Sequence, residues 1–149
     1  MDYDELMTFQ GDIYLNSIFE PQDNALILDI DRCKVNETME SAIENYQTID
    51  TDETLPILRI EFDWYIAYSV RNEGFTVMDE YEVFEGNTFC IYSKSRYLDF
   101  VEVSTIASDS YPGPFKHYGI VALNHIIDVI SQEPPTITLV NRTSSKTDI

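Results

Sequence analysis

The sequence predicts an α+β fold that is predominantly antiparallel β sheet, sandwich-like or highly curved, with one or two covering helices. The strongest evidence is residues 57–70, where every second residue from Leu58 to Val70 is apolar. Polar residues such as Arg59 and Glu61 stand between them. A period of two places successive side chains on opposite faces of a sheet, with one face buried and the other in water. Two further pairs of segments, each joined by a short turn, predict β-hairpins, and the segments of the first pair also alternate.

The first hairpin is predicted in residues 12–33. Residues 12–19 and 25–33 alternate around the turn-forming segment 20–24, which contains proline, aspartate and asparagine. In the second strand Leu26, Leu28 and Ile30 are expected to face the core, and Asp29 and Asp31 to face solvent. Residues 35–49 are ambiguous and could form a short helix, and 50–56 should form an exposed loop.

The segment 57–70 is long for a single strand. At about 3.3 Å per residue its fourteen residues would span roughly 46 Å, so we expect a bend or bulge near Trp64. After a short strand or connector at 75–78, residues 81–84 and 88–92 flank a turn that contains glycine and asparagine. These two residue types tolerate positive φ, which predicts a second hairpin.

Residues 93–107 are the best helix candidate, because a serine opens the segment and apolar residues follow at spacings of three and four. A strand remains an alternative, since four of its residues are β-branched. Residues 108–114 should form a loop. Residues 117–131 are expected to form a buried strand or two strands broken near Asn124, with a helix as the alternative. A last strand is predicted at 136–140.

The length of 149 residues indicates a single domain, 1–149, with frayed or weakly helical residues 1–8 and a polar tail at 141–149. Ten tyrosines and eight phenylalanines distinguish it from disordered acidic chains and exceed what a small core needs, so some should lie on the surface. The acidic N-terminus lacks the pattern of a signal peptide, so we expect a cytoplasmic protein in which Cys33 and Cys90 are free thiols.

The formal net charge is −18, and its distribution is uneven. Residues 1–85 contain 21 acidic and four basic side chains, whereas residues 86–149 contain six acidic and five basic ones. Such a field repels nucleic acid and anionic membranes and accelerates encounter with a basic protein. The alternative is that the acidity only serves solubility.

No motif for nucleotide binding, zinc hydrolysis or a nucleophile elbow occurs, so no cofactor, metal or catalytic residue is predicted. His117 and His125 are the only histidines. With Asp128 they could serve a small enzyme or ligand-binding protein, or simply be packed, hydrogen-bonded side chains.

The candidate site is therefore a partner-binding surface rich in carboxylates. Such a cluster could also be a paired-carboxylate or calcium site, or merely a solvated acidic face, and the charged residues at 71–73 could form a strand-end corner. The candidate partner-binding residues are Glu61, Asp63, Arg71, Glu73, Asp79, Glu80, Glu82 and Glu85.

In the phrases WYIAYSVRNEGF, SKSRYLDFV and HYGIVALNHIIDVIS the chain resembles a group of small uncharacterised bacterial proteins. In size, acidity and lack of an active-site signature it is similar to immunity proteins, which neutralise secreted bacterial toxins. The resemblance implies a non-enzymatic inhibitor that binds a basic toxin, for example a nuclease domain, and it implies no role for any single residue. The alternative is an acidic mimic of nucleic acid that blocks a DNA- or RNA-binding protein.

Overall fold

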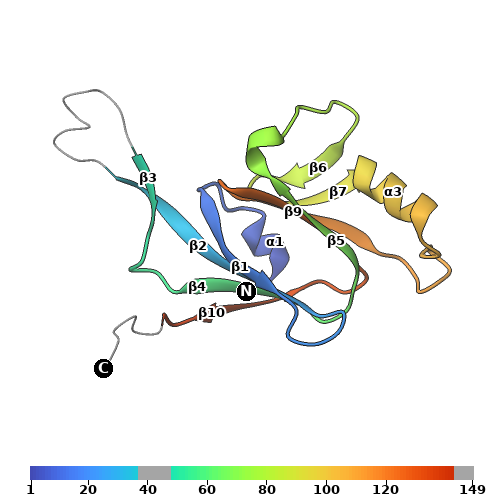
Figure 1. Cartoon of the computed structure of the whole chain (residues 1–149), viewed down its shortest axis with the longest axis horizontal. Coiled ribbons are helices and arrows are strands. Elements are labelled where there is room, and N and C mark those ends of the chain that lie inside the picture. The colour runs from blue at the N-terminus through green and yellow to red at the C-terminus, as the bar shows by residue number, and fades with distance from the viewer. Residues whose placement is uncertain (37–47, 143–149) are drawn as a thin grey trace.

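The computed structural model describes residues 1–36 and 48–142, and in this part of the chain all strand pairs are antiparallel (Figure 1). The predicted α+β class with predominant antiparallel sheet is confirmed, and its strands form two five-stranded sheets. The first sheet comprises β1 (Ile13–Phe19), β2 (Leu26–Asn36), β3 (Thr48–Thr51), β4 (Ile57–Phe62) and β10 (Thr136–Val140). The second comprises β5 (Tyr65–Asn72), β6 (Val83–Gly86), β7 (Phe89–Lys94), β8 (Lys116–Val121) and β9 (His125–Ser131). The helices are α1 (Tyr3–Leu6), the 3-10 helix η1 (Glu73–Phe75) and α3 (Arg96–Ser104).

The expected bend in residues 57–70 is the corner where the chain leaves one sheet and enters the other. β4 ends at Phe62 and β5 begins at Tyr65, on a different sheet. Leu58, Ile60 and Phe62 are buried as predicted, but Trp64 is 63% exposed, because it lies in the corner where strand pairing has stopped. The expectation that Trp64 faces the core is therefore wrong.

The hydrophobic core takes side chains from both sheets. Leu26, Leu28 and Ile30 of β2 are fully buried, as the alternation predicted. The ring of Phe62 meets that of Tyr118 edge-on at 5.4 Å, which joins the first sheet to the second. The other residues of the described core include Ile13, Leu15, Leu58, Ile60, Phe89, Ile120, Ile127 and Val129.

Both predicted hairpins are confirmed. Residues 117–131 form two strands separated by residues 122–124, which is the predicted alternative of two strands broken near Asn124. Gly86 has a φ of +99°, and a Cβ there would lie 2.1 Å from the carbonyl oxygen of Phe89. No other residue type fits this turn. The predicted helix at 93–107 is α3, and its N-cap is Ser95. The helix considered within 35–49 falls mainly on residues outside the described ranges, and Ile49 belongs to β3.

Residues 3–6 of the N-terminal segment form the helix α1, which is the helical one of the two expected alternatives, and the helix packs against the core. Tyr3 and Leu6 of α1 are buried, with exposed fractions of 3% and 6%. The hydroxyl oxygen of Tyr3 lies 2.9 Å from the carbonyl oxygens of both Cys90 and Gly119, and its ring meets that of Tyr118 edge-on. This buried tyrosine anchors the segment to the second sheet.

Asp29 and Asp31 were expected to face solvent, but both are buried and paired with arginines. The guanidinium group of Arg59 donates two hydrogen bonds to Asp29, at 2.8 and 3.0 Å, from the directly opposite position on β4. Arg142 lies 2.7 Å from Asp31. Burying a carboxylate is costly unless it is paired with a cation. These arginines therefore make it possible for the two aspartates of β2 to be buried.

Cys33 and Cys90 are both free thiols, as expected. Within the described residues no helix combines the length and the apolar character needed to cross a membrane.

We predict that the anchoring role of Tyr3 can be measured by equilibrium unfolding. Tyr3→Ala should lower the free energy of unfolding by about 3–5 kcal/mol, because it leaves a cavity between α1 and the core. Tyr3→Phe should cost about 1–2 kcal/mol through the lost hydroxyl. The matched control, Tyr14→Phe at a 43% exposed side chain, should change stability by less than about 0.5 kcal/mol. Equal effects at both tyrosines would contradict the assignment.

We also predict that stability declines in alkali. Burial raises the pKa of Cys90 to about 11 and that of Tyr118 to about 12, and it raises the pKa of Tyr3 and Tyr92. The unfolded chain then releases these protons at lower pH than the folded one, so the free energy of unfolding should be constant near neutrality and fall from about pH 9 upward. Urea titrations at stepped pH measure this, and Tyr118→Phe should flatten the slope. A flat profile up to pH 11 would refute it.

Candidate functional site

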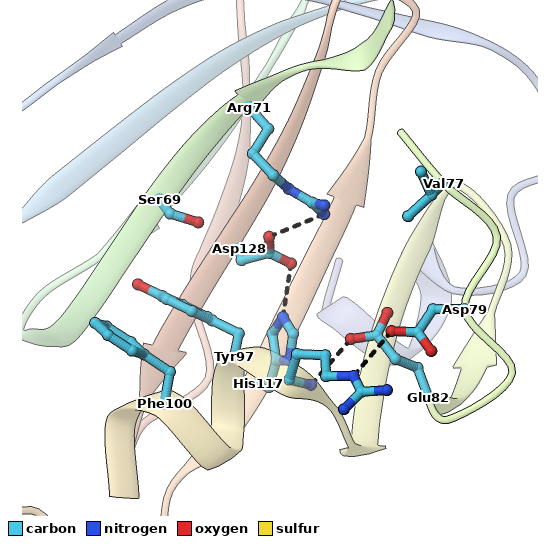
Figure 2. A pocket seen from close by; sticks show the side chains of 10 residues that line it. Ser69, Arg71, Val77, Asp79, Glu82, Tyr97, Phe100, His117 and Asp128 are labelled. Atoms are coloured by element: carbon cyan, nitrogen blue, oxygen red, sulfur yellow. Dashed lines mark hydrogen bonds and ion pairs between the residues drawn. The ribbon is translucent and has the colours of Figure 1, made fainter. Parts of the chain in front are cut away.

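A pocket of about 370 Å³ opens on the second sheet, between the segment 77–82 and α3 (Figure 2). Its floor is formed by strands β5, β8 and β9, and α3 closes one side. The lining residues are Ser69, Arg71, Val77, Asp79, Glu82, Arg96, Tyr97, Phe100, His117 and Asp128. The volume is within the range of small-ligand pockets, so the chemistry of its walls decides what it can do.

A chain of polar side chains runs beneath the pocket. Oγ of Ser95 lies 2.7 Å from Nδ1 of His117, and Nε2 of His117 lies 2.7 Å from Oδ1 of Asp128. Nη2 of Arg71 lies 3.4 Å from the other carboxylate oxygen of Asp128 (Figure 2). Because a carboxylate only accepts, Nε2–H of His117 donates to Asp128, and Nδ1 shares a hydrogen bond with the hydroxyl of Ser95.

The order serine, histidine, aspartate is that of nucleophilic hydrolases, but the serine is in the wrong place for attack. Ser95 is 0% exposed, and its oxygen also accepts the N–H of Leu98 at 3.0 Å as the N-cap of α3. His117 is 1% exposed, and both of its nitrogens are engaged. This chain of hydrogen bonds fastens α3 to β8 and β9 and presents no nucleophile to the pocket.

Aromatic rings enclose His117 from two sides. Tyr92 stacks on the imidazole with ring centroids 4.3 Å apart, and Tyr97 of α3 meets it edge-on at 5.6 Å. A Cβ at Gly119 would lie 2.5 Å from the ring of Tyr92, so the glycine leaves space for that ring. Burial raises the pKa of Tyr92 and of Tyr97, which keeps both phenols neutral.

Arg96 at the rim holds two neighbouring carboxylates in place. Nε of Arg96 donates to Asp79 at 3.1 Å, and its backbone N–H donates to the carboxylate of Glu82 at 3.1 Å. The guanidinium group also lies 4.1 Å from the ring centre of Tyr81, whose hydroxyl is hydrogen-bonded to Asp99. These contacts join the segment 79–82 to α3, and the hydrogen bond from Arg96 lowers the pKa of Asp79.

The structure brings only part of the predicted site together. Arg71, Asp79 and Glu82 line the pocket, and Glu80 is exposed between two of them. Glu85 lies on β6 opposite Ile91, a residue that packs against the core, so it belongs to the other face of that sheet.

The remaining predicted residues lie elsewhere. Glu73 begins η1 and lines a different hollow together with Asp12. Glu61 is on β4 of the first sheet, and Asp63 is at the corner that follows it. His125 opens β9 opposite Asn72 and does not line the pocket that His117 lines. In the described part of the chain no group of three or more histidine, cysteine or acidic side chains is placed to hold a metal ion.

Sequence reasoning missed the exposed apolar residues of the segment 77–78 and of α3, two of which, Val77 and Phe100, line the pocket. Val77 is 74% exposed, Met78 is 99% exposed, and on α3 Phe100 and Val103 are 61% and 87% exposed. The abundance of aromatic residues signalled that some would be exposed, but not where. We call the following set the docking face: Val77, Met78, Asp79, Glu80, Glu82, Asp99, Phe100 and Val103.

We predict that the polar chain is structural. Ser95→Ala should lower the free energy of unfolding by about 1–3 kcal/mol, because the helix loses its N-cap and His117 loses a partner. Ser93→Ala, two residues away at an exposed position, is the matched control and should have an effect of less than about 0.5 kcal/mol. Thermal and urea unfolding measure the difference, and similar values for the two serines would contradict this role.

Comparison of the chain with protein family models, with curated proteins and with solved structures finds no match to any of them. The proposal of a function therefore depends on the geometry and the charge of the molecule itself.

Proposed function

We propose that this protein is a non-enzymatic acidic binding protein whose docking face receives a basic protein partner. The observation that supports this is the juxtaposition of exposed apolar side chains with carboxylates. Exposed Val77 and Met78 belong to the same segment as Asp79 and Glu80, and Val77 lines the pocket from the side opposite Phe100 of α3 (Figure 2).

The apolar part of the docking face would supply most of the binding free energy. Contiguous exposed apolar side chains on a soluble protein mark interaction sites, and methionine and aromatic residues are enriched at interfaces. Phe100 is already held by a stacked contact with Tyr97, at 6.2 Å between ring centroids, so its ordering on binding costs little entropy.

The acidic part would select a positively charged partner and raise the rate at which the two proteins meet. A net charge of −18 attracts a basic protein over several ångströms and raises the association rate constant. Carboxylates also lie on α1, for example Asp4 and Glu5, so charge alone does not mark one face. The exposed apolar residues decide where the attracted partner docks.

In its most concrete form, the proposal is a cytoplasmic immunity protein or inhibitor that neutralises a basic toxin. A toxin that cleaves nucleic acid must attract phosphate, so its active site is basic and complementary to this chain. The burial of Ser95 and the complete pairing of His117 support a role without catalysis.

The test uses as its probe a basic toxin-like protein encoded by a reading frame next to this gene. We predict that the association rate constant falls steeply between low and high salt, whereas the dissociation rate constant changes little, because screening weakens long-range steering more than close contacts. Stopped-flow or surface-based kinetics measure both constants. Association that is insensitive to salt would count against the proposal.

Variants locate the interface within the same experiment. Met78→Ala together with Phe100→Ala should weaken binding by about 2 kcal/mol, roughly 30-fold, mainly through faster dissociation. The matched control is Phe19→Ala, at a 42% exposed phenylalanine of β1 on the first sheet, which should leave the affinity unchanged. Equal losses for the variant and the control would place the interface elsewhere.

A further inference from the structure

Most edge strands of the two sheets are protected against pairing with another chain, and β10 is the exception. β3, an edge strand that pairs with β2 alone among the described strands, has only four residues and includes Asp50. Sheet edges expose unpaired N–H and C=O groups, and proteins protect them with bulges, charges, short strands or covering segments. β10 is one edge of the first sheet and pairs with β4 alone (Figure 1).

The edge formed by β1 is covered. The side-chain amide of Asn124 accepts the N–H of Leu15 at 3.0 Å and donates to its C=O at 3.1 Å, as a strand neighbour would. The backbone N–H of Leu123 donates to the C=O of Ile13 at 2.8 Å. The corner between β8 and β9 therefore satisfies the first part of this edge, at residues 13–15, and a bulge between Leu15 and Ser17 interrupts the strand beyond it.

The edges of the second sheet are also protected. β6 has four residues, includes Glu85, and has a bulge between Val83 and Phe84. β5 has a bulge between Tyr65 and Ala67, and the N–H of Tyr65 donates to the C=O of Asn24. Both strands use the devices that discourage pairing with another chain.

β10 carries none of these protections. Its five residues, TITLV, pair with β4 in unbroken register and include no charge and no proline. On the side away from β4, no hydrogen-bond partner for its backbone occurs among the described residues. Leu139 pairs with Leu58 of β4 and lies on the same face of the sheet as the buried Ile137. Leu139 is nevertheless 50% exposed, because in the described part of the chain no strand follows β10 on that side of the sheet.

We propose that this edge pairs with β10 of a second copy of the chain, which joins the two first sheets into one continuous sheet. An antiparallel register centred on Thr138 pairs all five residues, with Ile137 of each copy opposite Leu139 of the other. The neutral strand is the place where two chains of charge −18 can approach with little repulsion. The inference is independent of the docking face, which lies on the second sheet.

The dimer is weak. A five-residue strand buries less than the roughly 1,200 Å² of a standard interface, so the second copy dissociates at low concentration. Because like charges repel, salt strengthens this dimer, whereas it weakens the complex with a basic partner.

Sedimentation velocity of the full chain, over a concentration series at low and high salt, tests the proposal. The expected result is a monomer–dimer equilibrium whose dimer fraction rises with concentration and with salt. Thr138→Lys should abolish the dimer, because it places two ammonium groups opposite each other at the two-fold axis. Val35→Lys, which adds the same charge at an exposed position of β2, should not.

Three results would overturn the proposal: a monomer under all conditions, a dimer that salt dissociates, or a dimer that Thr138→Lys leaves intact. Thermal unfolding of the variant shows whether it is folded. If it is not, Thr136→Lys, at an exposed position of the same strand, takes its place, with the same expected loss of the dimer.

Discussion

The corner between β4 and β5 is the constraint on which the rest of the fold depends. A single alternating segment supplies a central strand to the first sheet and an edge strand to the second. Because the chain turns at residues 63–64, the two sheets that it joins contribute to one core, in which Phe62 meets Tyr118. Had the segment remained one straight strand, the apolar faces of the two halves would have faced the same way and could not have packed on each other.

Three of the five arginines of this acidic chain pair with carboxylates that are largely shielded from water. Arg59 pairs with Asp29, Arg142 with Asp31, and Arg71 with Asp128. The side chains of these three aspartates are only 6–11% exposed. A buried carboxylate without a partner would be strongly destabilising, so these pairs are requirements of the fold. The consequence is that much of the remaining acidic surface lacks compensating cations, and the repulsion and steering described above arise from that surplus.

The parts of the fold that could be predicted are those with a local signal. The period of two identified β1, β2, β4 and β5, the β-branched composition of residues 117–131 favoured β8 and β9, and the glycine at position 86 marked a hairpin turn. The burial of Asp29 could not be predicted, because its partner Arg59 is 30 residues away and becomes its neighbour only through strand pairing. The same holds for Tyr3, whose hydroxyl binds two carbonyl groups of the second sheet that lie 87 and 116 residues later in the chain.

The candidate site was predicted only in part, for a related reason. Arg71, Asp79 and Glu82 were identified from charge, and they do lie together. Val77 and Met78 belong to an irregular segment without periodicity, so no pattern distinguished exposed apolar residues there from buried ones.

The polar chain beneath the pocket explains how the proposed docking face can be rigid although its apolar side chains contact solvent. Ser95 caps α3 and binds His117, which is itself held by Asp128 of β9. The backbone of Arg96 holds Glu82, so the segment with Met78 is tied to the same helix. A rigid surface loses little entropy on binding, and the free energy of burying its apolar residues then appears as affinity. The serine, histidine and aspartate that resemble a catalytic triad therefore have a sufficient physical role in positioning this surface.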